Sequence, residues 1–264
     1  MDATHKTPQA LAEEHRPRRW IIDAVIVAAL LVAAIIFYPW DDPVSDAMQR
    51  FFDSHLEPAI PRYVIQPFRL LGKTDMVFFL IIFISWATSN RRLLWRFTVA
   101  ASTSGLFVLF VKYVVGRQRP DADNYLSFPS GDSATAFTWA ALLAAEYPVL
   151  ALPSYAIAAM IAVLRVAHGR HHPSDILVGA AIGFIASRIA SRYIRIIPGW
   201  FSRMLRKIRW HVTAVVAFAS YVLLRAMFEK TFFRRPWALI LAAVVVAIVV
   251  LATRLRQKED GMTR

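Results

Sequence analysis

The chain has 264 residues, of which 57% are hydrophobic, and its 31 Lys and Arg against 18 Asp and Glu give a formal net charge of +13. This apolar content exceeds what a soluble core of this size can use, so it favours an all-α, polytopic membrane protein whose cations meet anionic lipid and not nucleic acid. The absence of cysteine excludes disulfides, thiolate catalysis and Cys-ligated metal centres.

Eight apolar stretches are candidates for transmembrane helices, which need about 20 mostly apolar residues. They lie near residues 20–39, 75–89, 96–114, 132–147, 150–165, 175–192, 211–228 and 237–253. The first follows a basic tail and has no small-residue cleavage site behind it, so we expect a retained membrane helix, with a signal peptide as the alternative. The fourth and fifth are short and close together, which predicts a tight helical hairpin.

These stretches divide the chain into five predicted regions. They are a cytoplasmic tail (1–19), a transmembrane catalytic core (20–192), a basic interfacial cytoplasmic segment (193–210), two additional transmembrane helices (211–253) and a second cytoplasmic tail (254–264). The basic segment interleaves cations with aromatic residues, and we expect it to bind anionic lipid at the inner surface.

The distribution of cations predicts the orientation, because cytoplasmic loops carry an excess of Lys and Arg. With the N-terminus inside, most clusters fall on the cytoplasmic side: Lys6, Arg16, Arg18, Arg19, Arg91, Arg92, Arg96, Arg192, Arg195, Arg203, Arg206, Lys207, Arg209, Arg254, Arg256 and Lys258. Five cations fall on the outer side instead: Lys112, Arg117, Arg119, Arg165 and Arg170. These exceptions require a functional reason.

The segment from about 40 to 73 joins the first two stretches on the outer side. It mixes aromatic residues with charges and prolines. This composition is typical of a membrane interface, and we expect a short amphipathic helix from about Val44 to His55.

The third stretch ends in Lys112-Tyr-Val-Val-Gly-Arg117-Gln-Arg119-Pro120, which places three cations within eight residues. We expect Pro120 to end the helix and to direct Arg119, whose planar guanidinium suits phosphate oxygens. The alternative is that these long side chains only reach toward the interface.

The sequence Ser127-Phe-Pro-Ser130-Gly131-Asp132 directly precedes the fourth stretch. Ser130 and Gly131 at a helix N-terminus present free backbone N–H groups and the positive end of the helix dipole, which favours an anion site. The alternative is a simple turn in which Asp132 caps the helix.

The fifth and sixth stretches are joined by Arg165-Val-Ala-His168-Gly-Arg170-His171-His172-Pro173-Ser174-Asp175. Pro173 suits the first turn of a helix, so the Asp175 carboxylate can reach back to the His171 imidazole four residues earlier. A carboxylate on one ring nitrogen leaves the other nitrogen free as a nucleophile. The alternative is a loop of solvated histidines with Asp175 as a cap.

Together the three clusters resemble the phosphatase motifs of the type 2 phosphatidic acid phosphatase (PAP2) family. The matching patterns are Lys112, six residues and Arg119-Pro120; Pro129-Ser130-Gly131; and Arg165, five residues, His171, three residues and Asp175. The resemblance covers about residues 70–192 and implies a PAP2-like six-helix core, here with two C-terminal helices added.

The resemblance also implies residue roles. His171 would form a phosphohistidine and Asp175 would orient it. The phosphate-binding residues would be Lys112, Arg119, Ser130, Gly131 and Arg165. No metal or other cofactor is implied, because these cations and helix-end amides neutralise the phosphate charge.

Two positions depart from the family pattern. Leu164 stands where a Ser usually precedes the Arg of the third motif, and Asp132 stands where the second motif usually ends in His. That His is the general acid of the family, so Asp132 takes the catalytic position of proton donor. Since aspartic acid holds a proton less well than histidine at neutral pH, we expect a bias toward diphosphate substrates.

The implied function is hydrolysis of a lipid phosphate or diphosphate at the periplasmic or extracellular face of the cell inner membrane. Candidate substrates are undecaprenyl diphosphate, phosphatidylglycerol phosphate, phosphatidic acid and lipid A phosphates. The alternatives are a catalytically weakened relative that binds, transports or scaffolds lipid headgroups, and a lipid phosphotransferase.

Overall fold

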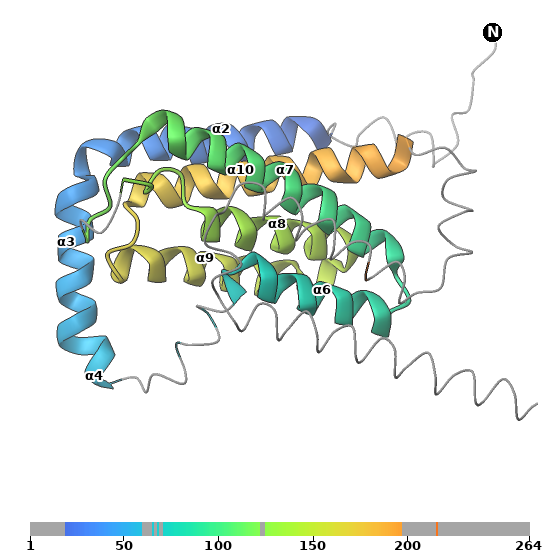
Figure 1. Ribbon diagram of the computed structural model, residues 1–264, viewed down its shortest axis with the longest axis horizontal. Helices are drawn as coiled ribbons and strands as arrows, with labels where there is room; N and C mark the ends of the chain where they lie inside the picture. The colour runs from blue at the N-terminus through green and yellow to red at the C-terminus, as the bar shows by residue number, and fades with distance from the viewer. Residues whose placement is uncertain are drawn as a thin grey trace, which may run out of the picture.

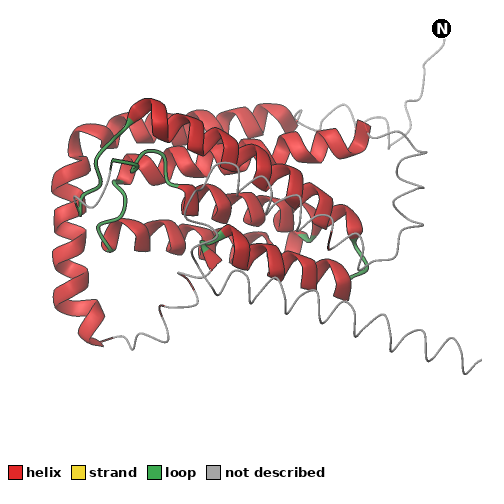
Figure 2. Ribbon diagram, viewed as in Figure 1, coloured by secondary structure: helices red, strands yellow, loops and turns green. Residues whose placement is uncertain are grey.

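The structure, a computed structural model, describes residues 19–59, 65, 68, 71–121, 125–196 and 215. Its regular secondary structure in these ranges is entirely helical (Figure 2). In chain order the helices are α2 (Arg19–Phe37), α3 (Asp41–Phe51), α4 (Glu57–Ala59), α6 (Thr74–Ala87), α7 (Arg91–Val115), α8 (Gly131–Glu146), α9 (Ala151–Ala167) and α10 (Pro173–Ile196). All but α3 and α4 run along one common direction and form a bundle (Figure 1).

The first six predicted stretches are confirmed as helices, with shifted ends. α7 begins at Arg91, earlier than expected, because the Asn90 side chain accepts a hydrogen bond from the Leu93 backbone N–H at 3.2 Å and caps a polar first turn. The prediction that Pro120 ends this helix is wrong. Gly116 ends it, in a left-handed conformation with φ of 57°, which a residue without Cβ adopts readily.

Four stretches in the described part are long and apolar enough to cross a membrane: Trp20–Leu56, Arg91–Val115, Pro148–Ala167 and Pro173–Tyr193. α6 is a shorter apolar helix. α8 has only 16 residues and many Ala, Ser and Thr, and most of its side chains are buried against α7, α9 and α10. The predicted spans 211–228 and 237–253 lie outside the described ranges, apart from Val215.

α8 is the central helix of the bundle, in contact with α7, α9 and α10. Its small side chains let α10 approach closely, as is usual in helix packing within membranes. The Thr138 hydroxyl donates to the Ala134 carbonyl at 2.7 Å within α8 and lies 3.2 Å from the Gly183 carbonyl of α10. The predicted hairpin is also present, since α8 and α9 pack together across the turn Pro148–Leu150.

The buried core fills the space between α6, α7 and α8. Phe78 and Phe97 pack edge to face with ring centroids 5.4 Å apart, and both side chains are fully buried. Leu93, Leu94 and Leu142 belong to the same cluster, which also includes residues of α9 and α10. The core therefore fixes the α7 and α8 ends that carry two of the three motifs.

α3 lies across the end of the bundle, nearly perpendicular to the other helices (Figure 1). The expected amphipathic helix is present, but it starts at Asp41 and continues through a π-helical stretch, Phe52–Leu56. Its inner face touches the loop between α9 and α10, where Phe52 packs on the His168 ring with centroids 4.7 Å apart. Phe51 and Trp40 stay exposed, as side chains at a membrane interface do.

Candidate active site

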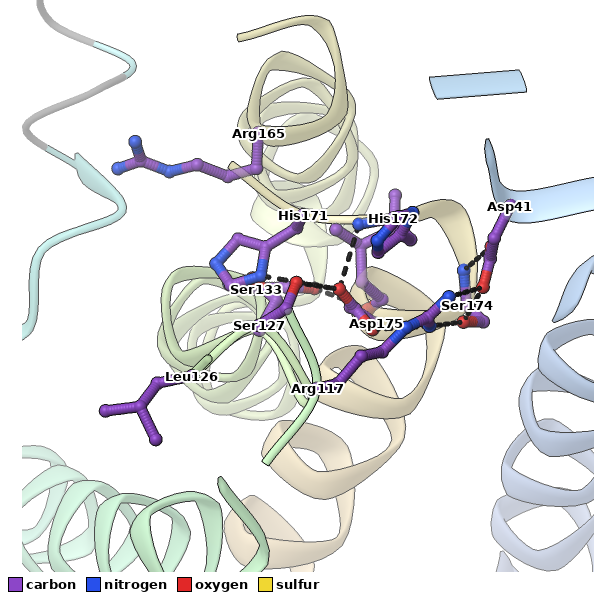
Figure 3. A network of polar contacts seen from close by, with 12 residues as sticks. Asp41, Arg117, Leu126, Ser127, Ser133, Arg165, His171, His172, Ser174 and Asp175 are labelled. Atoms are coloured by element: carbon purple, nitrogen blue, oxygen red, sulfur yellow. Dashed lines mark hydrogen bonds and ion pairs between the residues drawn. The ribbon is translucent and has the colours of Figure 1, made fainter. Parts of the chain in front are cut away.

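Three segments meet at the end of the bundle that α3 covers: the loop after α7, the start of α8 and the loop from α9 to α10 (Figures 1 and 3). The alternating direction of the helices brings the three sequence clusters to one end. The α6–α7 turn, with Arg91 and Arg92, lies at the opposite end (Figure 1).

His171 and Asp175 form the centre of this region. Proline starts α10 at residue 173, so the Asp175 side chain in the first turn points back toward the preceding loop. Asp175 Oδ2 lies 3.7 Å from His171 Nδ1, a separation longer than a hydrogen bond. Nδ1 thus faces the carboxylate, which leaves Nε2 as the ring nitrogen available for chemistry.

The Asp175 carboxylate is fully buried and is held by donors on both oxygens. Oδ2 accepts from the Ser127 hydroxyl at 2.5 Å and from the His172 backbone N–H at 2.9 Å. Oδ1 accepts from Arg117 Nη1 at 3.0 Å. A buried carboxylate requires such partners, and together they fix its orientation toward the imidazole.

The His171 imidazole is 4% exposed. Burial, the largest effect, lowers the pKa of His171 below the ordinary value of 6.5, and Lys112 adds to this; Asp175 and Asp132 act in the opposite direction. At neutral pH the ring is therefore neutral, which is the form that can act as a nucleophile.

Ser130 is the N-cap of α8, and its hydroxyl accepts from the Ser133 backbone N–H at 3.3 Å. The alternative in which Asp132 caps this helix is therefore wrong. The Ser130 N–H donates to the Asp175 carbonyl at 3.0 Å, which ties the start of α8 to α10. Gly131 is the first residue of α8, at the positive end of the helix dipole.

Lys112 and Arg119 flank this region from the end of α7 and the following loop. The Lys112 ammonium donates to the Leu126 carbonyl and, at 3.2 Å, to the Ser127 carbonyl. Arg119 Nε is buried without a hydrogen-bond partner among the described residues. Burial and then the charge of Arg170 lower the pKa of Arg119, which still remains cationic at neutral pH.

Arg165 reaches the site from the last turn of α9. Its Nε lies 2.6 Å from Asp132 Oδ2. The predicted proton donor, Asp132, is therefore ion-paired with Arg165, which is predicted to bind the phosphate. Gly72 lies against this pair: a Cβ there would meet Asp132 Cβ at 3.3 Å and Ile161 Cγ2 at 3.0 Å. The segment before α6 thus borders the same region.

The network also contains polar side chains that were not among the predicted site residues: Asp41, Arg117, Ser127 and Ser174. Asp41 accepts from the Ser174 backbone N–H at 2.8 Å and from the Ser174 hydroxyl, and it pairs with Arg117 Nη2 at 2.9 Å (Figure 3). Arg117 and Ser127 lie within recognised clusters, but Asp41 comes from a segment without any motif. Within the described ranges, no group of three His, Asp or Glu side chains could hold a metal ion.

Comparison with known proteins identifies similar chains. Residues 93–197 match the family model of the PAP2 superfamily. The chain is 39% identical over 82 residues to a lipid A 1-phosphatase of Porphyromonas gingivalis, a match covering 30% of this chain and 18% of that protein. It is 37% identical over 107 residues to a decaprenylphosphoryl-5-phosphoribose phosphatase of Mycobacterium tuberculosis, covering 37% of this chain and 59% of that protein. The chain thus spans less than two thirds of either relative.

A solved structure has a similar fold. The crystal structure of Aquifex aeolicus LpxE matches with a TM-score of 0.51 and 25% identity, covering 58% of this chain and 96% of that chain.

Proposed function

The region 93–197 belongs to the PAP2 superfamily, and from this premise we propose that the chain is an integral membrane phosphatase that removes a phosphate group from a lipid. The observation that carries the proposal is the buried His171–Asp175 pair, held 3.7 Å apart at one end of an apolar helix bundle. Lys112 acts electrostatically on His171, and Arg119 and Arg165 act on one another near Asp132.

The proposed phosphate-binding groups suit an anion. Arg119 offers a buried N–H that has no partner within the described residues, and burial makes such a donor costly unless an acceptor binds it. Ser130 and Gly131 lie at the start of α8, where the positive end of the helix dipole stabilises negative charge. These groups stabilise the charge that develops on the phosphoryl oxygens in the transition state.

In the first step, His171 Nε2 attacks phosphorus with its lone pair, and the bond from phosphorus to the lipid oxygen breaks. The imidazole becomes a positively charged phosphohistidine, which the Asp175 carboxylate stabilises through Nδ1. In the second step, water attacks the phosphohistidine, releases inorganic phosphate and regenerates the neutral imidazole.

Asp132 controls the leaving group. A lipid alkoxide needs a proton as it departs, whereas a phosphate leaving from a diphosphate has a second pKa of about 6 and departs without one. The Asp132 carboxylate is paired with Arg165 at 2.6 Å. Aspartic acid is also, by residue type, a poorer proton donor than histidine at neutral pH. We therefore propose that a diphosphate is cleaved faster than a simple monoester.

The bundle and the relatives support a lipid as the substrate. Four stretches of the described part are long and apolar enough to cross a membrane, which favours a site near the bilayer surface, where lipid headgroups lie. The relatives are named as phosphatases of lipid A and of decaprenylphosphoryl-5-phosphoribose. We propose a membrane lipid phosphate or diphosphate, and the cationic α6–α7 turn at the other end of the bundle favours a periplasmic or extracellular site.

The test is release of inorganic phosphate by purified protein in detergent. The panel is undecaprenyl diphosphate, phosphatidylglycerol phosphate, phosphatidic acid and lipid A. We expect release from at least one of them by the wild type and none by His171→Ala. Release by His171→Ala at the wild-type rate would contradict the assignment.

The Arg165–Asp132 ion pair also favours a second candidate, a catalytically weakened protein that binds lipid headgroups, because the carboxylate competes with phosphate for this cation. Such a protein would bind the panel lipids without releasing phosphate. A third candidate, transfer of the phosphoryl group to another lipid, would yield a new phospholipid in place of inorganic phosphate.

A further inference from the structure

Asp41 is a buried acid outside the region that matches the PAP2 superfamily. It is 1% exposed, at the first position of α3, and its carboxylate is held by the Ser174 backbone N–H, the Ser174 hydroxyl and Arg117 Nη2. Buried carboxylates persist only with such partners. Its contacts all belong to residues that adjoin Asp175.

Arg117 connects the two acids. Its Nη2 lies 2.9 Å from Asp41 Oδ2, and its Nη1 lies 3.0 Å from Asp175 Oδ1 and 2.8 Å from the Ser174 hydroxyl (Figure 3). The Tyr38 ring lies 5.0 Å from the guanidinium carbon and covers it. The guanidinium is thus fixed between two carboxylates, one on α3 and one on α10.

Asp175 lies between Arg117 and His171. Arg117 binds Oδ1, while Oδ2 faces the imidazole and accepts from Ser127 and the His172 backbone N–H. Figure 3 shows Arg117 and Asp41 on the side of Asp175 away from His171. Arg117 is thus the donor that holds Oδ1, while the other donors hold the oxygen that faces the ring.

The charge balance gives Asp41 a second effect. A lone guanidinium on Asp175 would offset the negative charge that the phosphohistidine needs, since an adjacent cation disfavours the charged imidazole. Asp41 offsets Arg117, so the three groups together keep one net negative charge.

We propose that Asp41 and Arg117 are a positioning pair that orients Asp175, and through it His171, for phosphoryl transfer. This proposal rests on the proposed phosphatase function. It assigns to α3, which the family match does not include, a direct part in the geometry of the site.

The test compares Asp41→Asn, Arg117→Gln and the double variant by kcat and KM for phosphate release. Asparagine keeps an oxygen that can accept from the Ser174 N–H in the first turn of α10. The hydrogen bond to this helix start is therefore retained while the negative charge is lost. We expect Asp41→Asn to lower kcat about 10- to 100-fold, the value of a hydrogen bond to a charged group, with little change in KM. The matched control is Asp46→Asn, an exposed acid on the same helix, which keeps the wild-type kcat.

The double variant decides between a positioning pair and two independent residues. We expect it to lose less kcat than the product of the two single losses, because removing both charges leaves no buried ion unpaired. If Asp41→Asn does not fold, the double variant alone suffices, and we expect its kcat to be about 10-fold below wild type. A double variant with wild-type kcat, or strictly multiplicative losses, would overturn the proposal. Inactive wild-type protein would instead refute the proposed function.

Discussion

His171 is buried beside the Asp175 carboxylate, and the Lys112 cation also acts on it. Burial and Lys112 lower its pKa, while Asp175 and Asp132 raise it. The balance determines the pH at which the imidazole is neutral, and only the neutral ring can attack phosphorus. Residue-scale electrostatics thus control the rate of the proposed reaction.

A pH profile of kcat/KM tests this balance. Because the pKa of His171 lies below 6.5, the neutral nucleophile persists to lower pH, and we expect the acid limb below pH 6.5. In Asp175→Asn the fall of the residual kcat/KM on the acid side should occur at a still lower pH. The reason is that Asp175 no longer raises the pKa of His171. The substrate ionises identically in both proteins and serves as the internal control. A limb that moves upward in Asp175→Asn would contradict the prediction.

Asp132→His places the histidine that is usual in the family at the proposed proton-donor position. We expect a gain of up to about 10²-fold in kcat on phosphatidic acid and a smaller gain on undecaprenyl diphosphate, whose leaving group needs no proton. The control is Asp132→Asn, which also frees Arg165 but donates no comparable proton; it should lower KM on both substrates without a preference. Equal gains of Asp132→His on both substrates would show that the leaving-group explanation is wrong.

Some site residues were predictable from their local spacing. Others belong to the site only through long-range contacts, which the sequence does not reveal. His171 and Asp175 are four residues apart at a helix start, so their approach follows from sequence alone. Asp41 meets Ser174 across 133 positions, and no local pattern encodes that contact. The Asp132–Arg165 pair likewise depends on how α8 and α9 pack, which explains why Asp132 was expected to act only as a proton donor or a cap.

At the scale of elements, α8 and α10 pack closely together. This packing keeps the start of α8, with Ser130 and Gly131, next to Asp175 in the first turn of α10. A Cβ at Gly183 would collide with the Ala134 carbonyl and would lie 3.0 Å from the Thr138 backbone nitrogen. Backbone atoms cannot move aside as a flexible side chain can, so a substitution must separate the helices.

Gly183→Ala should therefore destabilise the protein. Overpacking costs about 1–3 kcal/mol, so we expect the Tm in detergent to fall by about 2–12 °C. The matched control is Gly105→Ala on α7, where a Cβ meets nothing within 4 Å and where alanine favours the helix. An unchanged Tm in Gly183→Ala would contradict the packing described here.

Six helices were predictable because their apolar stretches are long and bounded by polar residues and prolines. Their ends were less predictable, since caps and not hydropathy determine them: Asn90 extends α7 backward, and Gly116 stops it before Pro120. The position of α3 across the bundle depends on contacts such as Phe52 with His168, which only the folded chain reveals.

At the scale of the whole molecule, the chain is a membrane helix bundle with its candidate site at one end. The predicted basic segment 193–210 extends beyond Ile196, the last described residue of α10. The side of the membrane on which it lies is a prediction independent of the candidate site. We expect it to lie on the cytoplasmic side and to bind anionic lipid, because its cations follow the positive-inside pattern. A reporter fused after Arg206 should be cytoplasmic, with a fusion in the α3 region as the opposite control; a periplasmic reporter after Arg206 would contradict the predicted span count.

The central claim is that His171 carries the phosphoryl group during turnover. Rapid quenching of the purified protein with its substrate at alkaline pH, followed by peptide mass spectrometry, measures this directly. We expect a phosphoryl group on His171 in the wild type and in the neighbouring control His168→Ala, and none in His171→Ala, which also releases no phosphate. A phosphoryl group on another residue, or phosphate release by His171→Ala at the wild-type rate, would contradict it.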